Sequence, residues 1–115
     1  MHKTPSGDWS GSETEIKKIA TESAKAFDPA TVANALELLA LMRDRCPIPE
    51  VAKGYGSTIR FCWGGNLEIE VFPDHVEAYR FRDQHTDIWH YAHRPGAPFS
   101  TELMSELPVL PEPNS

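Results

Sequence analysis

The chain has 115 residues, of which 40% are apolar and 24% are charged, and its formal net charge is −6. This length and composition suit one globular domain and exclude a fibrous or wholly disordered chain. The acidic balance disfavours nucleic-acid backbones as partners, and no segment has the roughly 18 uninterrupted apolar residues of a membrane span.

No internal repeat divides the chain. We therefore expect a single α+β domain over residues 11–108, between a flexible lead over residues 1–10 and a loose, Pro-rich tail over residues 109–115. The N-terminus lacks an apolar leader, which favours a cytoplasmic location. In that reducing compartment Cys46 and Cys62, which form no C-x-x-C motif, are expected to be free thiols.

A first helix is predicted from the spacing of its apolar residues. Between residues 16 and 27 they recur at intervals of three and four, which makes one apolar stripe. Ser12 and Glu15 have the S-x-x-E spacing of a capping box, in which each side chain bonds a free backbone amide at the helix start. The predicted start is therefore Ser12.

A second helix is predicted from Asp28-Pro29 to about Arg45, because Asp is a good N-cap and Pro fits the first helical turn. Residues 35–42 are apolar on more than one side of this helix. It should therefore pack against both the first helix and a sheet. Two prolines in residues 47–57 stop the helix, and we expect that segment to be an extended connection.

Two strands are predicted over residues 57–63 and 67–72, because apolar and polar residues alternate there. A slip of one residue would move a strand's apolar side chains to the wrong face. A three-residue loop over residues 64–66 keeps the apolar sets together and pairs Trp63 with Leu67, Phe61 with Ile69, and Ile59 with Val71.

Continued along the chain, the alternation makes residues 73–75 a three-residue connection and residues 83–87 the next turn. The helix-covered face then receives the aromatic residues Tyr79, Phe81, Trp89 and Tyr91. A short capped helix is expected from Phe99 to Met104. The predicted fold is α+β, with two N-terminal helices packed on one face of a four-stranded antiparallel meander and a short C-terminal helix.

The opposite face of this sheet is expected to be polar. The predicted register sets Arg60 opposite Glu70, Glu68 opposite Arg80, and Arg80 opposite His90. Such cross-strand pairs stabilise a sheet by roughly 0.2–1 kcal/mol each, which is a sufficient reason for their presence. The functional alternative is a binding surface made of the outward side chains Arg60, Glu68, Glu70, Arg80, Arg82 and His90.

A histidine-rich segment is a candidate metal site. His85, His90 and His93 fall within nine residues, with Asp83 and Asp87 nearby. On an extended strand, however, His90 and His93 point to opposite faces, whereas metal ligands must converge on one ion. We therefore expect no metal and no other cofactor.

Catalysis is not expected either, because the inward strand residues offer no titratable or nucleophilic group apart from tyrosines. Cys62 is predicted to lie beside Glu68, whose negative charge disfavours the reactive thiolate. No catalytic residues are assigned.

The sequence thus favours a small acidic, non-enzymatic protein-binding module that docks on another protein or on a second copy of itself. Two alternatives stay open. One is an inhibitor or immunity-type protein that presents acidic residues to a basic target site; residues 73–115 carry seven acids against three bases. The other is a metal-dependent or acid–base enzyme that uses the region of His85 and His90.

Overall fold

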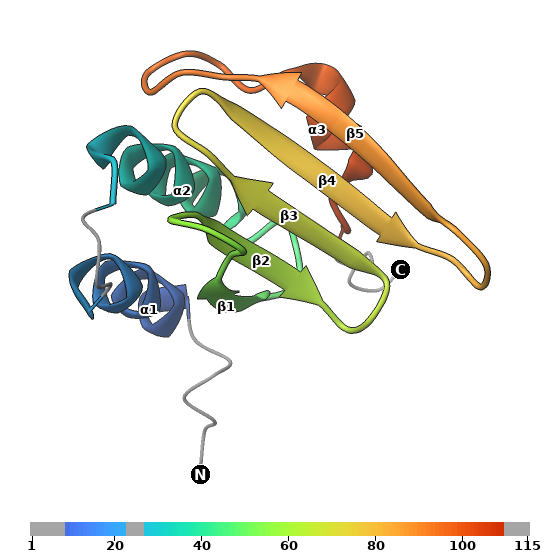
Figure 1. Cartoon of the computed structure of the whole chain (residues 1–115), viewed down its shortest axis with the longest axis horizontal. Coiled ribbons are helices and arrows are strands. Elements are labelled where there is room, and N and C mark those ends of the chain that lie inside the picture. Colours follow the sequence, from blue (N-terminus) through green and yellow to red (C-terminus); the bar gives the residue numbers. More distant parts are fainter. Residues whose placement is uncertain (1–8, 23–26, 110–115) are drawn as a thin grey trace, which may run out of the picture.

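The computed structural model describes residues 9–22 and 27–109 (Figure 1). It confirms the α+β class, with two N-terminal helices, an antiparallel sheet and a short C-terminal helix, but the sheet has five strands where four were predicted. In chain order the elements are α1 (Trp9–Glu22), α2 (Pro29–Met42), β1 (Glu50–Lys53), β2 (Ile59–Trp63), β3 (Leu67–Val71), β4 (His75–Phe81), β5 (Thr86–Ala92) and α3 (Thr101–Glu106).

The sheet is a meander in the order β1-β2-β3-β4-β5, and every neighbouring pair is antiparallel. The described helices all pack on one of its faces, with α1 and α2 toward β1–β3 and α3 toward β4 and β5 (Figure 1). The core between helices and sheet is built from large apolar side chains that are almost fully buried, among them Ile16, Leu38, Met42, Phe61, Ile69 and Leu103.

The first helix includes Trp9, so it begins before the predicted start. The capping-box prediction is wrong, because Ser12 lies inside the helix and is buried there. The predicted continuation to residue 27 crosses residues 23–26, which lie outside the described part of the chain. Phe27 itself is buried just before α2.

The second helix has the predicted N-cap, since the Asp28 carboxylate accepts a hydrogen bond of 2.8 Å from the backbone N–H of Ala30. It ends at Met42, earlier than the predicted Arg45. The chain leaves the helix in a turn in which Asp44 takes a left-handed conformation (φ 66°). The backbone N–H of Arg45 closes this turn on the Met42 carbonyl at 3.0 Å.

The hairpin of β2 and β3 has the predicted register throughout, with Trp63 opposite Leu67, Phe61 opposite Ile69 and Ile59 opposite Val71. Gly64 takes the left-handed conformation in its loop (φ 57°), which favours glycine at that position. The segment predicted as a plain connection contains β1, whose four residues pair with β2. A strand this short shows too little alternation to be recognised in the sequence.

The register of β4 was predicted wrongly. Phe72 donates its N–H to the His75 carbonyl at 2.9 Å, so β3 and β4 are joined by two turn residues instead of the predicted three. This moves every β4 side chain to the opposite face. Val76 and Ala78 face the helices and are fully buried, whereas Tyr79 and Phe81 do not face the core as predicted.

A contact with α2 fixes this turn. The side-chain amide of Asn34, itself fully buried, donates to the carbonyls of Phe72 (2.9 Å) and Pro73 (3.1 Å). Trp89 and Tyr91 do pack against the core as predicted, but they lie opposite Ala78 and Val76 and not opposite Phe81 and Tyr79.

The shift also places Arg80 on the helix-covered side, opposite Leu67 and Asp87. Its guanidinium donates to the backbone carbonyl and the carboxylate of Glu106 in α3, at 3.2 and 3.3 Å. The predicted pairs of Arg80 with Glu68 and with His90 are therefore wrong.

The third helix begins slightly later than predicted, and the Ser100 hydroxyl caps it by accepting from the N–H of Leu103 at 3.1 Å. Within residues 9–22 and 27–109, no helix has the length and apolar character that a membrane crossing requires.

Candidate functional site

The face of the sheet turned away from the described helices, called the outer face below, collects most of the polar strand residues. Because side chains alternate along a strand, the register alone decides which residues it presents. They include Glu50, Arg60, Cys62, Glu68, Glu70, His75, Glu77, Tyr79, Phe81, Ile88 and His90.

A buried carboxylate lies at the centre of this face. Glu70 is only 3% exposed, and its Oε2 accepts from the Thr58 hydroxyl at 2.5 Å and from the backbone N–H of Tyr55 at 3.2 Å. The loop that carries Tyr55 closes over Glu70 at Gly54, where a Cβ would lie 1.9 Å from the Thr58 hydroxyl oxygen. A side chain at position 54 would thus prevent this closure.

Tyr79 joins Glu70 to Glu77, the residue directly opposite Glu70 on β4. The Tyr79 hydroxyl contacts Oε1 of Glu77 closely and lies 3.3 Å from Oε1 of Glu70. Burial raises the pKa of Tyr79, and the charges of Glu77 and Glu70 raise it further. The phenol therefore keeps its hydrogen and can donate to one of these carboxylates.

His75 continues the array beyond Glu77. Its Nδ1 lies 2.7 Å from Asp74 Oδ1 and its Nε2 lies 3.2 Å from Glu77 Oε2. The ring is stacked between Phe72 and His90, with centroid separations of 4.0 and 4.2 Å. The hydrogen bond to His75 holds the pKa of Asp74 below its ordinary value.

A second polar group occupies the β2 side of the outer face. Arg60 forms an ion pair with Glu68 at 3.1 Å, and its guanidinium lies over the Tyr55 ring, 4.9 Å from the centroid. Burial and the neighbouring Glu68 raise the pKa of Cys62, and Arg60 opposes this rise only in part. Cys62 is accordingly poorly suited to act as a nucleophile at neutral pH.

The residues predicted for one binding surface therefore lie in different parts of the sheet. Arg60, Glu68, Glu70 and His90 lie on the outer face, and the predicted Arg60–Glu70 pair is present in the register. Arg80 lies on the opposite face. Arg82 follows β4 in the turn to β5, where it forms a 2.5 Å ion pair with Asp87.

The three histidines singled out in the sequence lie apart. His85, in the β4–β5 turn, is exposed and lies 3.5 Å from Asp87. His93 is buried, stacks on Phe99 with a centroid separation of 3.8 Å, and lies 3.8 Å from Glu37 of α2. Burial lowers the pKa of His93, and Glu37 opposes this shift.

Sequence reasoning missed His75, Glu77 and Tyr79 as members of one group. The signal was their spacing of two residues, which puts all three on the same face of any strand. It could be used only once the β4 register was known, because the opposite register buries alternate residues of the same segment.

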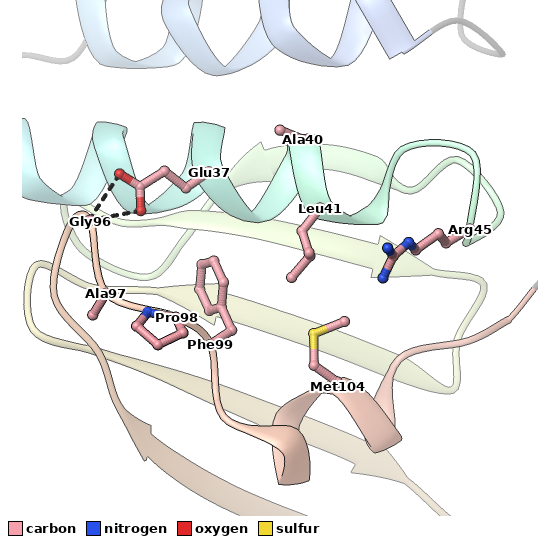
Figure 2. A pocket seen from close by; sticks show the side chains of 9 residues that line it. All are labelled: Glu37, Ala40, Leu41, Arg45, Gly96, Ala97, Pro98, Phe99 and Met104. Atoms are coloured by element: carbon pink, nitrogen blue, oxygen red, sulfur yellow. Dashed lines mark hydrogen bonds between the residues drawn. The ribbon is translucent and has the colours of Figure 1, made fainter.

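A groove on the helical side is the other candidate. It has a volume of about 650 Å³ and lies between α2 and the segment from Gly96 to Met104. Figure 2 shows apolar side chains of Leu41, Phe99 and Met104 between Glu37 at one end and Arg45 at the other. Both Glu37 oxygens accept from the Gly96 N–H at 3.1 Å, so this carboxylate is already used to anchor the segment.

Comparison of the chain with protein families, with curated proteins and with solved structures finds no match.

Proposed function

We propose that this chain is a non-enzymatic protein-binding module that docks the outer face of its sheet on a basic surface of another protein. The observation that supports this most directly is the row of carboxylates held in place on a face that the described helices leave open. The Tyr79 hydroxyl, which also contacts the buried Glu70, fixes the position of Glu77 before any partner arrives. Prearranged groups bind with a smaller loss of conformational entropy.

Charge defines the partner. The accessible outward strand residues include three carboxylates and one guanidinium, which give a net charge of −2 with the histidines neutral: Glu50, Glu68 and Glu77 against Arg60. The buried Glu70 adds negative potential beneath them. Such a surface attracts a basic partner and repels a second copy of itself.

Apolar contact area adjoins the carboxylates. Phe81 and Ile88 are large apolar residues with exposures of 36% and 60%, and both lie on the outer face. Ile88 is directly opposite Tyr79, whose ring lies 6.5 Å from that of Phe81. Aromatic and aliphatic side chains next to fixed polar groups are typical of the central residues of protein interfaces.

A binding role fits the chemistry of the array better than catalysis. In the described part of the chain, the hydrogen-bond partners of His75 are carboxylates, so this imidazole does not activate a hydroxyl or thiol. An inhibitor or immunity-type role is a special case of this proposal, in which the carboxylates of the outer face occupy a basic functional site on the target. The free thiols Cys46 and Cys62 suit a reducing, cytoplasmic setting.

Quantitative affinity capture from the source cell tests this proposal with matched variants. Glu68→Lys and Ile88→Lys alter the outer face. Glu102→Lys and Val109→Lys make the same chemical changes at exposed positions outside the sheet. We expect the outer-face variants to lose a specific partner at least tenfold and the controls to retain it. Equal recovery with all four variants, or loss with the controls alone, would contradict the proposal.

Self-association would use a different part of the molecule. β5 is an edge strand of seven residues, and an edge of this length can pair with the same strand of a second copy. Sedimentation velocity of wild type, Ile88→Pro and Ile88→Lys separates β5 pairing from association through the outer face, because both variants remove the Ile88 side chain and only proline removes the backbone donor. A dimer that persists in Ile88→Pro is not formed by β5 pairing, and one lost in Ile88→Pro but kept in Ile88→Lys is.

A further inference from the structure

Three potential metal ligands meet on the outer face, and two of them, His75 and Glu77, were not predicted as ligands from the sequence. His75 and Glu77 are two residues apart on β4, and His90 of β5 lies directly opposite Glu77. One ligand atom from each of the three lies within 4.8 Å of the other two. The histidine ring nitrogens and the carboxylate oxygen thus come from two adjacent, hydrogen-bonded strands, which hold them more firmly than a loop would.

His75 is oriented as a metal-binding histidine is. Asp74 Oδ1 lies 2.7 Å from Nδ1, where it can accept the Nδ1 hydrogen, and Nε2 faces Glu77. A carboxylate behind the ligating imidazole fixes the tautomer and the ring orientation in many metal sites. The stacking of the ring on Phe72 restricts it further.

The contact between His75 and Glu77 sets two potential ligand atoms side by side, with Nε2 3.2 Å from Glu77 Oε2. This separation is close to the distance of about 3.4 Å between two ligand atoms of one tetrahedral zinc ion. Tyr79 contacts the other oxygen of Glu77, so Oε2 is the one that faces His75 Nε2.

The surroundings favour a cation. Glu70 lies directly opposite Glu77 and is buried, so it adds negative potential that water screens poorly. Among the ion pairs of residues 9–22 and 27–109, Glu77 pairs with His75 and with no Lys or Arg. The guanidinium on the outer face, that of Arg60, is paired with Glu68.

From this geometry we infer a binding site for one divalent transition-metal ion, best suited to Zn²⁺, with His75, Glu77 and His90 as ligands. Two imidazoles and one carboxylate match the donor preference of Zn²⁺, and the exposed side of the site leaves a fourth position for water or for a partner's side chain. With metal–ligand bonds of about 2.1 Å, the ligand atoms must approach to about 3.4 Å. His90 is exposed and can supply this movement by rotating out of its stack.

This inference does not depend on the proposed protein-binding function, and its test needs no partner. The full chain, stripped with a chelator and titrated with Zn²⁺ in a calorimeter, should bind one ion. Glu77→Gln and His90→Asn should each weaken binding at least tenfold, and Asp74→Asn about tenfold, the effect typical of losing a carboxylate that orients a ligating imidazole. His85→Asn, which changes an exposed histidine outside the cluster, should leave the affinity within about twofold of wild type, the agreement expected of a site it does not touch.

A measurement on the unaltered protein guards against variants that misfold. In ¹⁵N-detected NMR of the histidine rings, Zn²⁺ should shift the signals of His75 and His90 and leave those of His85 and His93 in place. Failure to bind Zn²⁺ stoichiometrically, ring shifts at other histidines alone, or unchanged affinity in both His90→Asn and Glu77→Gln would each overturn the inference.

Discussion

Replacing Gly54 with alanine should be among the most destabilising small substitutions in this protein. The added Cβ would lie 1.9 Å from the Thr58 hydroxyl oxygen and 2.7 Å from Oε2 of Glu70. The Thr58 side chain cannot turn away without losing its 2.5 Å hydrogen bond to the buried Glu70 carboxylate. The substitution therefore combines overpacking with the loss of a hydrogen bond to a buried charge.

The size of the effect follows from these two terms. Overpacking costs about 1–3 kcal/mol, and a hydrogen bond to a charged group contributes about 1.5–3 kcal/mol. Because relieving one term worsens the other, we expect a total loss of about 3 kcal/mol in the free energy of unfolding, a large share of the roughly 5–15 kcal/mol of a typical domain. Urea denaturation followed by circular dichroism would measure it.

Gly56 supplies a matched control in the same loop. A Cβ there meets no atom within 4 Å, so Gly56→Ala should change stability by less than about 1 kcal/mol and can raise it by restricting the unfolded chain. In a Thr58→Ala background the penalty of Gly54→Ala should fall, because the closest clashing atom is gone. Equal stabilities for Gly54→Ala and Gly56→Ala would refute the reasoning about this loop.

Three further predictions concern the helical side. Burial lowers the pKa of His93 in the folded protein, so the unfolded chain binds a proton at this residue more readily. The folded state should therefore lose stability as the pH falls from about 6.5 toward the pKa of His93 in the folded protein. The difference between the urea midpoints at pH 7.5 and 5.5 should be smaller in His93→Phe than in wild type, and His85→Asn should leave it unchanged. An unchanged difference in His93→Phe would contradict this. Asp28→Ala should lower the free energy of unfolding by about 1 kcal/mol through loss of the α2 cap, as thermal unfolding would show. Arg80→Met should increase amide exchange in α3, because the contacts to Glu106 are lost, but should leave partner capture unchanged; normal protection of α3 would count against that anchoring role.

The sequence determined the helices and the first hairpin because each carried a strong local signal. Asp28 before Pro29 marks the start of α2 through local hydrogen bonding, which does not depend on what the helix packs against. In β2 and β3 the larger apolar residues alternate with charged or small polar residues. Only one register therefore places Phe61 and Ile69 together on the buried face. The α+β class followed from these elements.

Only the tertiary structure decided the register of β4, and with it the candidate site. Either parity of this strand offers apolar residues to the core, Val76 with Ala78 or Tyr79 with Phe81, so alternation does not choose between them. The choice was made by a helix 38 residues away in the sequence, whose Asn34 binds the carbonyl of Phe72 and fixes the turn. That long-range contact turns His75 and Glu77 outward beside His90 and turns Arg80 inward toward α3, an outcome that no local pattern could reveal.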